Sequence, residues 1–470
     1  MSCDFFILMK SELSLAVILF ILFFLKLEKR EWKNESLSGF VSFLLLVNFA
    51  LGFFMNTNGE LFNGMFRTNS VIALEKNILN LGALIISMQA FTWLKNHKHV
   101  VEFYMLMLST LIGMFFMISS GNLLMFWIGL ELSTIPLAAL CNFDLEKRKS
   151  SEAAMKMIMS SAFSSGILLF GISMMYGTTG TLSFAELPQH LSANPLQLFA
   201  FILLFTGFAF KISAVPFHLW TADVYEGSPV SVTSYLSVIS KGAVIFIFIS
   251  ALYTVFKPLG AIWYNVLYLT SVLTMIIGNL FAIRQNNLKR FLAFSSIAQV
   301  GFILIGISGS SQMGTASVIY FVLIYVFSNL GAFGVISLVS ALTGKEDVND
   351  YKGFYKTNPL LSWVLTISLF SLAGIPPTAG FFGKLFLLTA GASKGNYTLI
   401  TIAALNMIVS LYYYLRVVKI MFMDKSDHPI EKLKTGMLPG LALAICVAGI
   451  VIIGFSGHIY NYIYTLSFGM

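Results

Sequence analysis

The sequence contains few charged residues for its length. Only 11% of its 470 residues are Asp, Glu, Lys or Arg, whereas 57% are hydrophobic. Soluble globular domains carry about 25% charged residues. This shortage of charge excludes an ordinary soluble domain and predicts a protein that lies in a membrane along its whole length.

Other absences limit the chemistry of the chain. The three cysteines, Cys3, Cys141 and Cys446, are far apart and form no CxxC pair, which argues against a disulfide framework, a zinc site or an Fe–S site. No glycine-rich loop follows a predicted strand, so no nucleotide site is expected. We therefore expect neither a metal nor a bound cofactor in this chain.

Long apolar runs are present in place of these features. A membrane-spanning helix needs roughly 20 mostly apolar residues, and the all-α polytopic fold predicted on this basis has about fourteen spans. The first is short, and the third carries Glu75 and Lys76 near its start. The twelfth is too long for one straight helix and contains AGIPPTAGFFGK, which should break it. The predicted spans are 12–26, 37–55, 71–94, 103–119, 121–143, 152–176, 197–220, 229–256, 263–283, 287–308, 314–342, 359–392, 397–423 and 436–457.

The N-terminal run is not read as a cleaved signal peptide. Glu12 interrupts the approach to it, and no small-x-small site precedes the charges KLEKRE.

The basic residues between the spans alternate between the two sides. The N-terminus and the loops after even-numbered spans hold only Lys10, Arg67, Lys257 and Lys394. Because basic loops stay on the inner side, this pattern predicts that both termini lie outside, and it explains the net charge of +8 without a nucleic-acid partner. The loops after odd-numbered spans, together with the span ends that border them, hold eighteen basic residues: Lys26, Lys29, Arg30, Lys33, Lys95, Lys98, Lys147, Arg148, Lys149, Arg284, Lys289, Arg290, Lys345, Lys352, Lys356, Lys425, Lys432 and Lys434.

Seven basic residues remain inside the predicted spans. Lys76 and Lys156 lie near span ends and are expected to reach the interface by snorkelling, as are Arg416 and Lys419. The remaining three are Lys211, Lys241 and Lys384.

Lys211, Lys241 and Glu131 lie near the middle of their spans. A charge at the bilayer centre costs about 2.5–3.5 kcal/mol, so these groups must face protein or water. Two interpretations are open: a relay whose members exchange protons, or static ion pairs that fix helix packing.

Two helix breaks adjoin lysines. Pro216 removes a backbone donor in the seventh span, five residues after Lys211. The free carbonyls that result are tolerated in a membrane only where they line a cavity or are buried in protein. The second break, in AGIPPTAGFFGK, directly precedes Lys384, which should lie toward the outer side.

Interrupted helices at corresponding places indicate a transport site between two repeats. We expect inverted five-helix repeats formed by spans 4–8 and 9–13. The predicted domains are residues 1–100, 101–258, 259–425 and 426–470.

Three further residues lie near the inner end of the seventh span. His218 can titrate near neutral pH, but it can equally be a hydrogen-bonded packing residue. Asp223 and Glu226, in TADVYEGSPVSV, lie either at the inner mouth of a path or in a solvated helix cap before Pro229.

Several segments resemble a known family. They are GLELSTIPLAAL, KISAVPFHLWTADVYEGSPVSVTSYLSVISK, NNLKRFLAFSSIAQVGFILIGI, LAGIPPTAGFFGKLFLL and the run that begins SEAAMKMIMSS. Together they resemble the antiporter-like membrane subunits of respiratory complex I, NADH–quinone oxidoreductase, over residues 100–425. The DVYEGSP motif, the lysine after the second break and the short C-terminus are most similar to the subunit N branch. Subunit M typically has a glutamate after that break, and subunit L has a long lateral helix.

The resemblance implies roles for matching residues. Glu131 and Lys211 would form the carboxylate–lysine pair of a first half-channel, Lys241 would be the connecting lysine, and Lys384 would serve a second half-channel. His218 would join the hydrated path. Quinone reduction elsewhere in the complex would drive proton movement here.

The resemblance also implies partners and a location. FMN, Fe–S clusters and quinone would be bound by other subunits, and the partners would include subunits M, L, K and J in a hetero-oligomer. The expected location is a bacterial inner membrane, with a chloroplast membrane as the alternative. Three other functions remain open: an Mrp-type Na⁺/H⁺ antiporter subunit, a complex I relative with a donor other than NADH, and a non-transporting scaffold.

Overall fold

The computed structural model describes residues 3–28, 32–54, 58–309 and 311–468. The predicted inner-loop residues Lys29 and Arg30, and the side chain of Cys3, lie outside this description. The described chain is almost entirely helical, as predicted. This follows from the bilayer, where a helix satisfies its backbone hydrogen bonds within one segment.

The helices of the first half include most of the long apolar runs. They are α1 Cys3–Leu8, α2 Lys10–Leu27, α3 Asn34–Leu51, α4 Ser70–Leu94, α5 Val100–Ile118, α6 Leu123–Cys141, α7 Arg148–Thr179, α8 Leu187–His190, α9 Pro195–Ile212, α10 Leu219–Gly227, α11 Val230–Tyr235, the π-helical η1 Leu236–Ser240, α12 Lys241–Thr254 and the short η2 Lys257–Leu259.

The second half continues in the same way. Its helices are α13 Gly260–Ile283, α14 Leu288–Ile307, α15 Ser311–Thr343, η3 Val348–Tyr351, α16 Phe354–Thr357, α17 Pro359–Ala373, α18 Ala379–Ala392, α19 Tyr397–Phe422, α20 Met437–Phe455 and α21 Gly457–Leu466. A two-stranded antiparallel hairpin, β1 Gly59–Leu61 with β2 Phe66–Thr68, precedes α4. The sequence did not predict this hairpin, since its strands are only three residues long.

Twelve helices in the described part of the chain are long and apolar enough to span a membrane. Two more of the predicted spans correspond to other helices. The first is α2, which carries Lys10, Glu12 and Lys26, and the twelfth is divided into the shorter apolar helices α17 and α18. The polytopic helical fold is therefore confirmed, while the count of fourteen spans stays a prediction.

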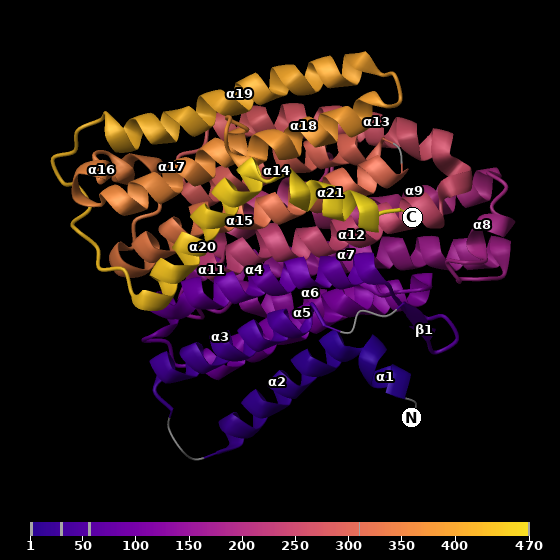
Figure 1. Ribbon diagram of the computed structural model, residues 1–470, viewed down its shortest axis with the longest axis horizontal. Helices are drawn as coiled ribbons and strands as arrows, with labels where there is room; N and C mark the ends of the chain where they lie inside the picture. The colour runs from indigo at the N-terminus through magenta and orange to yellow at the C-terminus, as the bar shows by residue number, and fades with distance from the viewer. Residues whose placement is uncertain (1–2, 29–31, 55–57, 310, 469–470) are drawn as a thin grey trace.

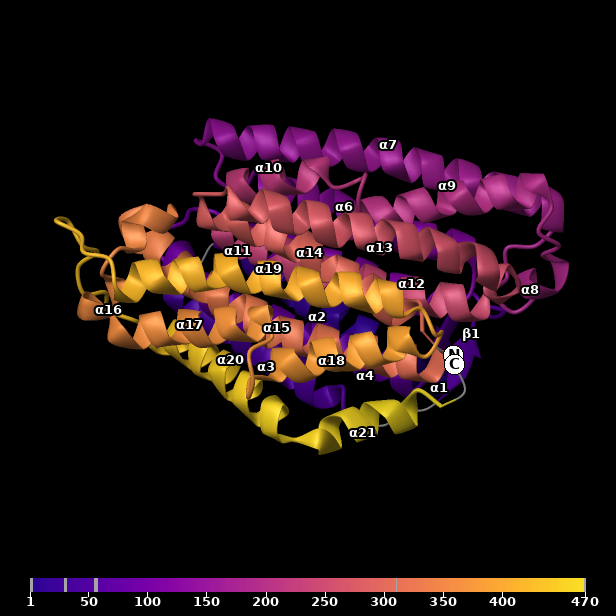
Figure 2. The ribbon, with the colours of Figure 1, turned by 90° about the horizontal axis from the view of Figure 1, so that it is seen from above.

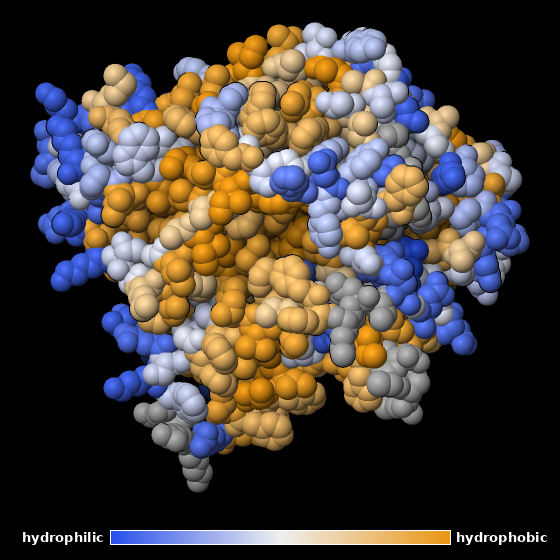
Figure 3. Space-filling view, in the orientation of Figure 1, coloured by the Kyte–Doolittle hydropathy of each residue, from blue (hydrophilic) through white to orange (hydrophobic). Residues whose placement is uncertain are grey.

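The helices run side by side along one direction, and the two termini lie at the same end of the bundle (Figure 1). Seen from above, α7 and α9 form one edge, and α20 and α21 form the opposite edge (Figure 2). On the face drawn in Figure 3, apolar side chains cover most of the middle, and hydrophilic ones gather mainly toward the two ends. This face therefore has an apolar middle between two more polar ends, as expected for a protein that lies in a membrane.

Four helical segments form the centre of the bundle and are buried along nearly their whole length. They are α4, α11 with η1 and α12, α14, and α15. Helices α3, α7, α13, α19 and α20 keep an exposed apolar face. Charged groups carried by the central helices are consequently shielded from lipid by other protein.

Both predicted breaks are present. Helix α9 ends at Ile212, and α10 begins at Leu219 after an irregular segment that contains Pro216. Helix α17 ends at Ala373 with Gly374 in the left-handed region at φ 86°, and α18 begins at Ala379. Gly380 allows α18 to approach α17, because a Cβ there would lie 1.7 Å from the carbonyl oxygen of Ser371.

The prediction that Lys76 snorkels is wrong. Lys76 is buried and forms an ion pair of 2.6 Å with Glu12 of α2, and both side chains are only 3% exposed. The sequence places these partners 64 residues apart, so the pair becomes visible only once α2 packs in the fold. Lys156, in contrast, is 41% exposed and reaches the polar end of the bundle.

Candidate functional site

Lys211 lies in the last turn of α9, immediately before the first break. The residue is 8% exposed, and its ammonium donates a hydrogen bond to Thr134 Oγ1 on α6. The Thr134 hydroxyl itself donates to the carbonyl oxygen of Leu130 at 2.6 Å. Since the hydroxyl proton is already used, Thr134 serves Lys211 as a fixed acceptor.

Glu131 lies three residues before Thr134 on the same face of α6. Its carboxylate accepts a hydrogen bond from the Ser165 hydroxyl of α7, and the same hydroxyl accepts one from Trp127 Nε1 at 3.1 Å. No ion pair within 4.0 Å joins Glu131 to Lys211. The two predicted partners are thus brought to one region, with Thr134 rather than Glu131 in contact with the lysine.

The irregular segment after Lys211 is held by hydrogen bonds to neighbouring helices. The backbone N–H of Val215 donates to Thr274 Oγ1 of α13 at 3.0 Å, and the Thr221 hydroxyl donates to Ser213 Oγ at 2.7 Å. His218 ends the segment and is buried, and its Nδ1 has no hydrogen-bond partner in the described structure. Both interpretations of His218, as a titrating group and as a packing residue, therefore stay predictions.

Lys241 is the first residue of α12 and follows the π-helical turn η1. It is 3% exposed and donates to Ser296 Oγ of α14 at 2.6 Å. Its ammonium also lies 5.3 Å from the centre of the Tyr225 ring of α10, a cation–π contact. The second half of the broken helix thus touches the lysine in the middle of the bundle.

Lys384 lies on α18, immediately after the second break, and is 1% exposed. Its ammonium donates to the carbonyl oxygen of Ala373 at 3.1 Å and lies 4.9 Å from the centre of the Phe302 ring. Ala373 is the last residue of α17, so the lysine occupies a carbonyl that the break leaves without a helical partner.

Helix α14 connects the surroundings of Lys241 and Lys384. Ser296, Gln299 and Phe302 follow one another at three-residue intervals and therefore share a face of the helix. Ser296 accepts from Lys241, and Gln299 Nε2 donates to the carbonyl oxygen of Leu372 at 2.9 Å. Gln299 Oε1 is buried and has no described partner. The sequence analysis missed these residues, although Ser296 and Gln299 interrupt the apolar run FLAFSSIAQVGFILIGI.

Asp223 and Glu226 are held in a network of ion pairs at the end of α10, where they remain partly exposed. Asp223 is 2.6 Å from both Lys156 Nζ and Arg290 Nη1, and Glu226 is 3.1 Å from Arg290 Nη1. Lys149 approaches Glu226 at 3.2 Å. The network covers the end of α10 at the end of the bundle opposite the termini.

The ion pairs also set the titration of this network. Partial burial alone would raise the pKa of Asp223, but hydrogen bonds from Lys156 and Arg290 outweigh it and lower the pKa below its ordinary value. Glu226 behaves similarly, with its pKa lowered against burial by hydrogen bonds from Lys149 and Arg290. Both groups therefore carry their negative charge firmly at neutral pH.

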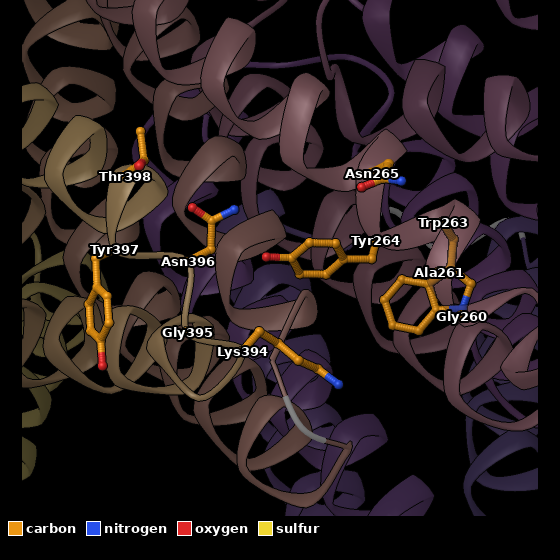
Figure 4. A pocket seen from close by; sticks show the side chains of 10 residues that line it. All are labelled: Gly260, Ala261, Trp263, Tyr264, Asn265, Lys394, Gly395, Asn396, Tyr397 and Thr398. Atoms are coloured by element: carbon orange, nitrogen blue, oxygen red, sulfur yellow. The ribbon is translucent and has the colours of Figure 1, made fainter.

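The described residues contain no group of three or more His, Cys, Asp and Glu that could hold a metal ion. Cys141 and Cys446 are buried and unpaired. A groove at the other end of the bundle lies between the start of α13 and the α18–α19 connection, where Trp263, Tyr264, Lys394 and Tyr397 line it (Figure 4). None of the predicted site residues lines this groove.

Comparisons with known proteins agree on the family. The family described as NADH:quinone oxidoreductase/Mrp antiporter, TM, matches residues 120–410. The chain is 46% identical over 462 residues to NADH-quinone oxidoreductase subunit N of Phocaeicola vulgatus, which covers 96% of this chain and 97% of that one. It is 44% identical over 475 residues to the subunit N of Azobacteroides pseudotrichonymphae, covering 99% and 98%.

Solved structures show the same fold. A chain of respiratory complex I from Thermus thermophilus with bound aureothin superposes with a TM-score of 0.81 at 26% identity, covering 94% of this chain and 96% of that one. A chain of the Mrp complex from a Dietzia species superposes with a TM-score of 0.87 at 20% identity, covering 99% and 97%. The chain therefore belongs to the NADH:quinone oxidoreductase/Mrp antiporter family, and within it to the NADH-quinone oxidoreductase subunit N branch.

Proposed function

We propose that this chain is a proton-translocating membrane subunit of an NADH–quinone oxidoreductase, in which quinone reduction by other subunits drives proton movement through the buried lysines. The observation that carries this proposal is the kind of partner these lysines have. Lys211, Lys241 and Lys384 each donate to a neutral oxygen, and none lies within 4.0 Å of a carboxylate of the described residues.

Lys76 provides the contrast within the same chain, because it is buried to a similar degree and paired with Glu12 at 2.6 Å. A static lock needs such a pair, since an uncompensated buried charge is costly. A lysine with a neutral partner can release its proton without stranding a carboxylate. The scaffold interpretation therefore suits Lys76 and Glu12, whereas the relay interpretation suits the three lysines.

The proposed path follows the contacts. Glu131 and Lys211 serve the first half-channel, His218 joins the path in the break, Lys241 connects the halves beside Tyr225 and Ser296, and Lys384 serves the second half-channel. Moving one proton against 100 mV costs about 2.3 kcal/mol, and a pKa change of two units supplies about 2.7 kcal/mol. Small changes in the surroundings of a buried lysine can thus supply enough free energy to move one proton across the membrane.

The proposal includes the setting of the chain. The end of the bundle with the basic loops faces the inside, so both termini face outside, and the membrane is a bacterial inner membrane. Residues 101–258 and 259–425 form the two half-channel repeats, flanked by 1–100 and 426–470. FMN, Fe–S clusters and quinone belong to partner subunits, among them M, L, K and J in the membrane arm.

The test is Lys211→Met in the intact complex, with Lys356→Met, at an exposed lysine, as the control. We expect Lys211→Met to assemble and to lose proton transport together with most of the coupled quinone reduction, while the control keeps both. Normal transport in Lys211→Met would refute the relay, and lost assembly would favour the scaffold.

The same membranes distinguish a proton pump driven by NADH from an ion exchanger and from a pump with a different electron donor. Transport that requires Na⁺ and proceeds without quinone would support an Mrp-type exchanger, whose fold this chain shares. If another reduced carrier but not NADH supports quinone reduction, the chain would still belong to a proton pump, but the electron donor of that pump would not be NADH.

A further inference from the structure

A second group of buried charges lies between the N-terminal helices, away from the three lysines. It consists of Glu12 on α2, Arg67 on β2, and Glu75 and Lys76 on α4. Lys76 is satisfied by Glu12, and its ammonium also lies 5.1 Å from the centre of the Phe66 ring. The positive charge of Lys76 therefore has its own counter-charge and does not need Glu75.

Glu75 has no such partner among the described residues. The residue is 2% exposed, its Oε1 is buried without any hydrogen bond from the described residues, and no ion pair within 4.0 Å reaches its carboxyl from them. An ionised carboxylate in these surroundings would be costly. The neutral carboxylic acid, which carries a proton, is therefore the form of Glu75 with the lower free energy.

Helix α4, which carries Glu75, packs against α12, the helix of Lys241. Leu79 is one turn along the same face of α4 as Glu75, and it packs against Gly242, where a Cβ would lie 3.4 Å from Leu79 Cδ2. Gly242 directly follows Lys241. Glu75 thus lies about one helical turn from Leu79, roughly 6 Å along the axis of α4. It is the nearer of the two to the end of the bundle that carries the termini.

Arg67 stands between Glu75 and that end. Its guanidinium donates to Ser250 Oγ near the end of α12 at 3.0 Å and to the carbonyl oxygen of Ser120 at 3.1 Å. Arg67 is partly exposed. Burial lowers its pKa, and the negative charges of Glu60 and Glu75 oppose that shift. An ionised Glu75 would consequently be stabilised by a cation that also touches the surface.

We propose that Glu75 is a further proton-carrying site, which passes protons from Lys241 to the outer surface beside Arg67. In the step, the O–H bond of the Glu75 acid breaks and the proton leaves to outside water. An N–H bond of the Lys241 ammonium then breaks, and its proton re-forms the acid through intervening water, leaving a neutral amine. Among the described residues, the charged groups that act on Glu75 are Arg67 on the hairpin and Lys76 on α4. Lys76 in turn faces Glu12 and Lys10 of α2.

This inference rests on the proposed function, and its test separates the two. Glu75→Gln keeps the shape of the side chain and removes the exchangeable proton, and Glu60→Gln makes the same change at an exposed glutamate of the hairpin. Both variants are made in the intact complex, and Lys211→Met is measured in parallel with them. Proton transport and the infrared carbonyl band of protonated carboxylic acids during turnover are measured.

We expect Glu75→Gln to assemble, to lose proton transport and to lose a carboxylic acid band that responds to turnover, while Glu60→Gln keeps all three. Normal transport and an unchanged band in Glu75→Gln, with transport lost in Lys211→Met, would overturn the inference alone. Normal transport in Lys211→Met would overturn the proposed function itself.

A second variant covers the case in which Glu75→Gln does not assemble. Glu75→Asp keeps the acid, so a turnover-dependent band that shifts in frequency supports the inference. A band that is unaltered in Glu75→Asp would overturn it.

Discussion

Lys211 and Thr134 are joined across α9 and α6 by a hydrogen bond in which the lysine can only donate and the threonine can only accept, because the Thr134 proton is committed to Leu130. The contact fixes the ammonium one helical turn from Glu131 without pairing the two charges. A change in the distance between the Lys211 ammonium and the Glu131 carboxylate would therefore alter the electric field at the lysine without breaking an ion pair. Thr134 thus positions Lys211, and with it the proposed first half-channel.

The first prediction concerns Thr134→Val, which keeps the shape of the side chain and removes the acceptor. A buried polar group left without its partner costs about 1–3 kcal/mol, and more when it is charged. We expect a lower thermal unfolding midpoint of the purified complex and reduced proton transport in vesicles. Thr134→Ser restores the acceptor and should restore both, so a Val variant that matches the Ser variant would contradict the role of this hydroxyl.

The second prediction concerns the pH dependence of the Asp223 network. Since the pKa of Asp223 is lowered in the folded protein, the network stabilises the fold fully above the unfolded value of about 3.9. This contribution is lost as the pH falls through the lower folded value. The thermal midpoints of wild type and Asp223→Asn should therefore differ at neutral pH and converge below about pH 4.

Salt provides the control for that measurement. Asp223 and Arg290 are 34% and 32% exposed, so added salt should narrow the difference at neutral pH by screening. Asp427→Asn, at an exposed aspartate of the same end of the bundle, should match wild type throughout. A gap between wild type and Asp223→Asn that persists unchanged into strong acid would rule out the ion pairs as its cause.

The third prediction concerns Glu12 and Lys76. Breaking a buried pair by removing one partner costs about 3–5 kcal/mol, so Glu12→Gln and Lys76→Met should each destabilise the chain strongly. The double variant leaves no orphaned charge and should cost less than the sum of the two. Unfolding of the purified chain gives the three values, and strict additivity would show that the pair does not act as a unit.

The exposed pair Lys95–Glu35 is the matched control, with an equally close approach of 2.7 Å but side chains 55% and 50% exposed. Its removal should change the unfolding little, because water and salt screen such a pair.

The charged residues of the candidate site can be selected from the sequence alone. Lys211, Lys241 and Lys384 stand out because a cation in an apolar run is costly wherever the run spans a bilayer, and prolines mark both breaks without any knowledge of packing. Thr134, Ser165, Ser296 and Gln299 could not be selected in this way. Neutral polar residues are common in such helices, and their spacing does not say which neighbour they meet.

The wrong prediction for Lys76 has the same origin as these omissions. Lys76 lies near a helix end in the sequence, and only the packing of α2 supplies Glu12. In the sequence Glu75 is only a charge near the start of the third span, and the packing of its helix against α12 through Leu79 and Gly242 is visible only in the fold. The local sequence thus shows which charges are unfavourable in a membrane. Which group stabilises each charge depends on contacts between segments that are distant in the sequence.

The two breaks have an electrostatic consequence. Lys211 lies in the last turn of α9, and Lys384 binds the last carbonyl of α17, so each cation sits at the carboxyl end of a half-helix. The aligned peptide dipoles place about half a negative elementary charge there. In the proposed relay, a lysine that gives up its proton would leave the negative end of its half-helix without this nearby cation. Each proton step of that relay would thus change the electrostatic balance at a backbone break, which links the two broken helices to the charge state of their lysines.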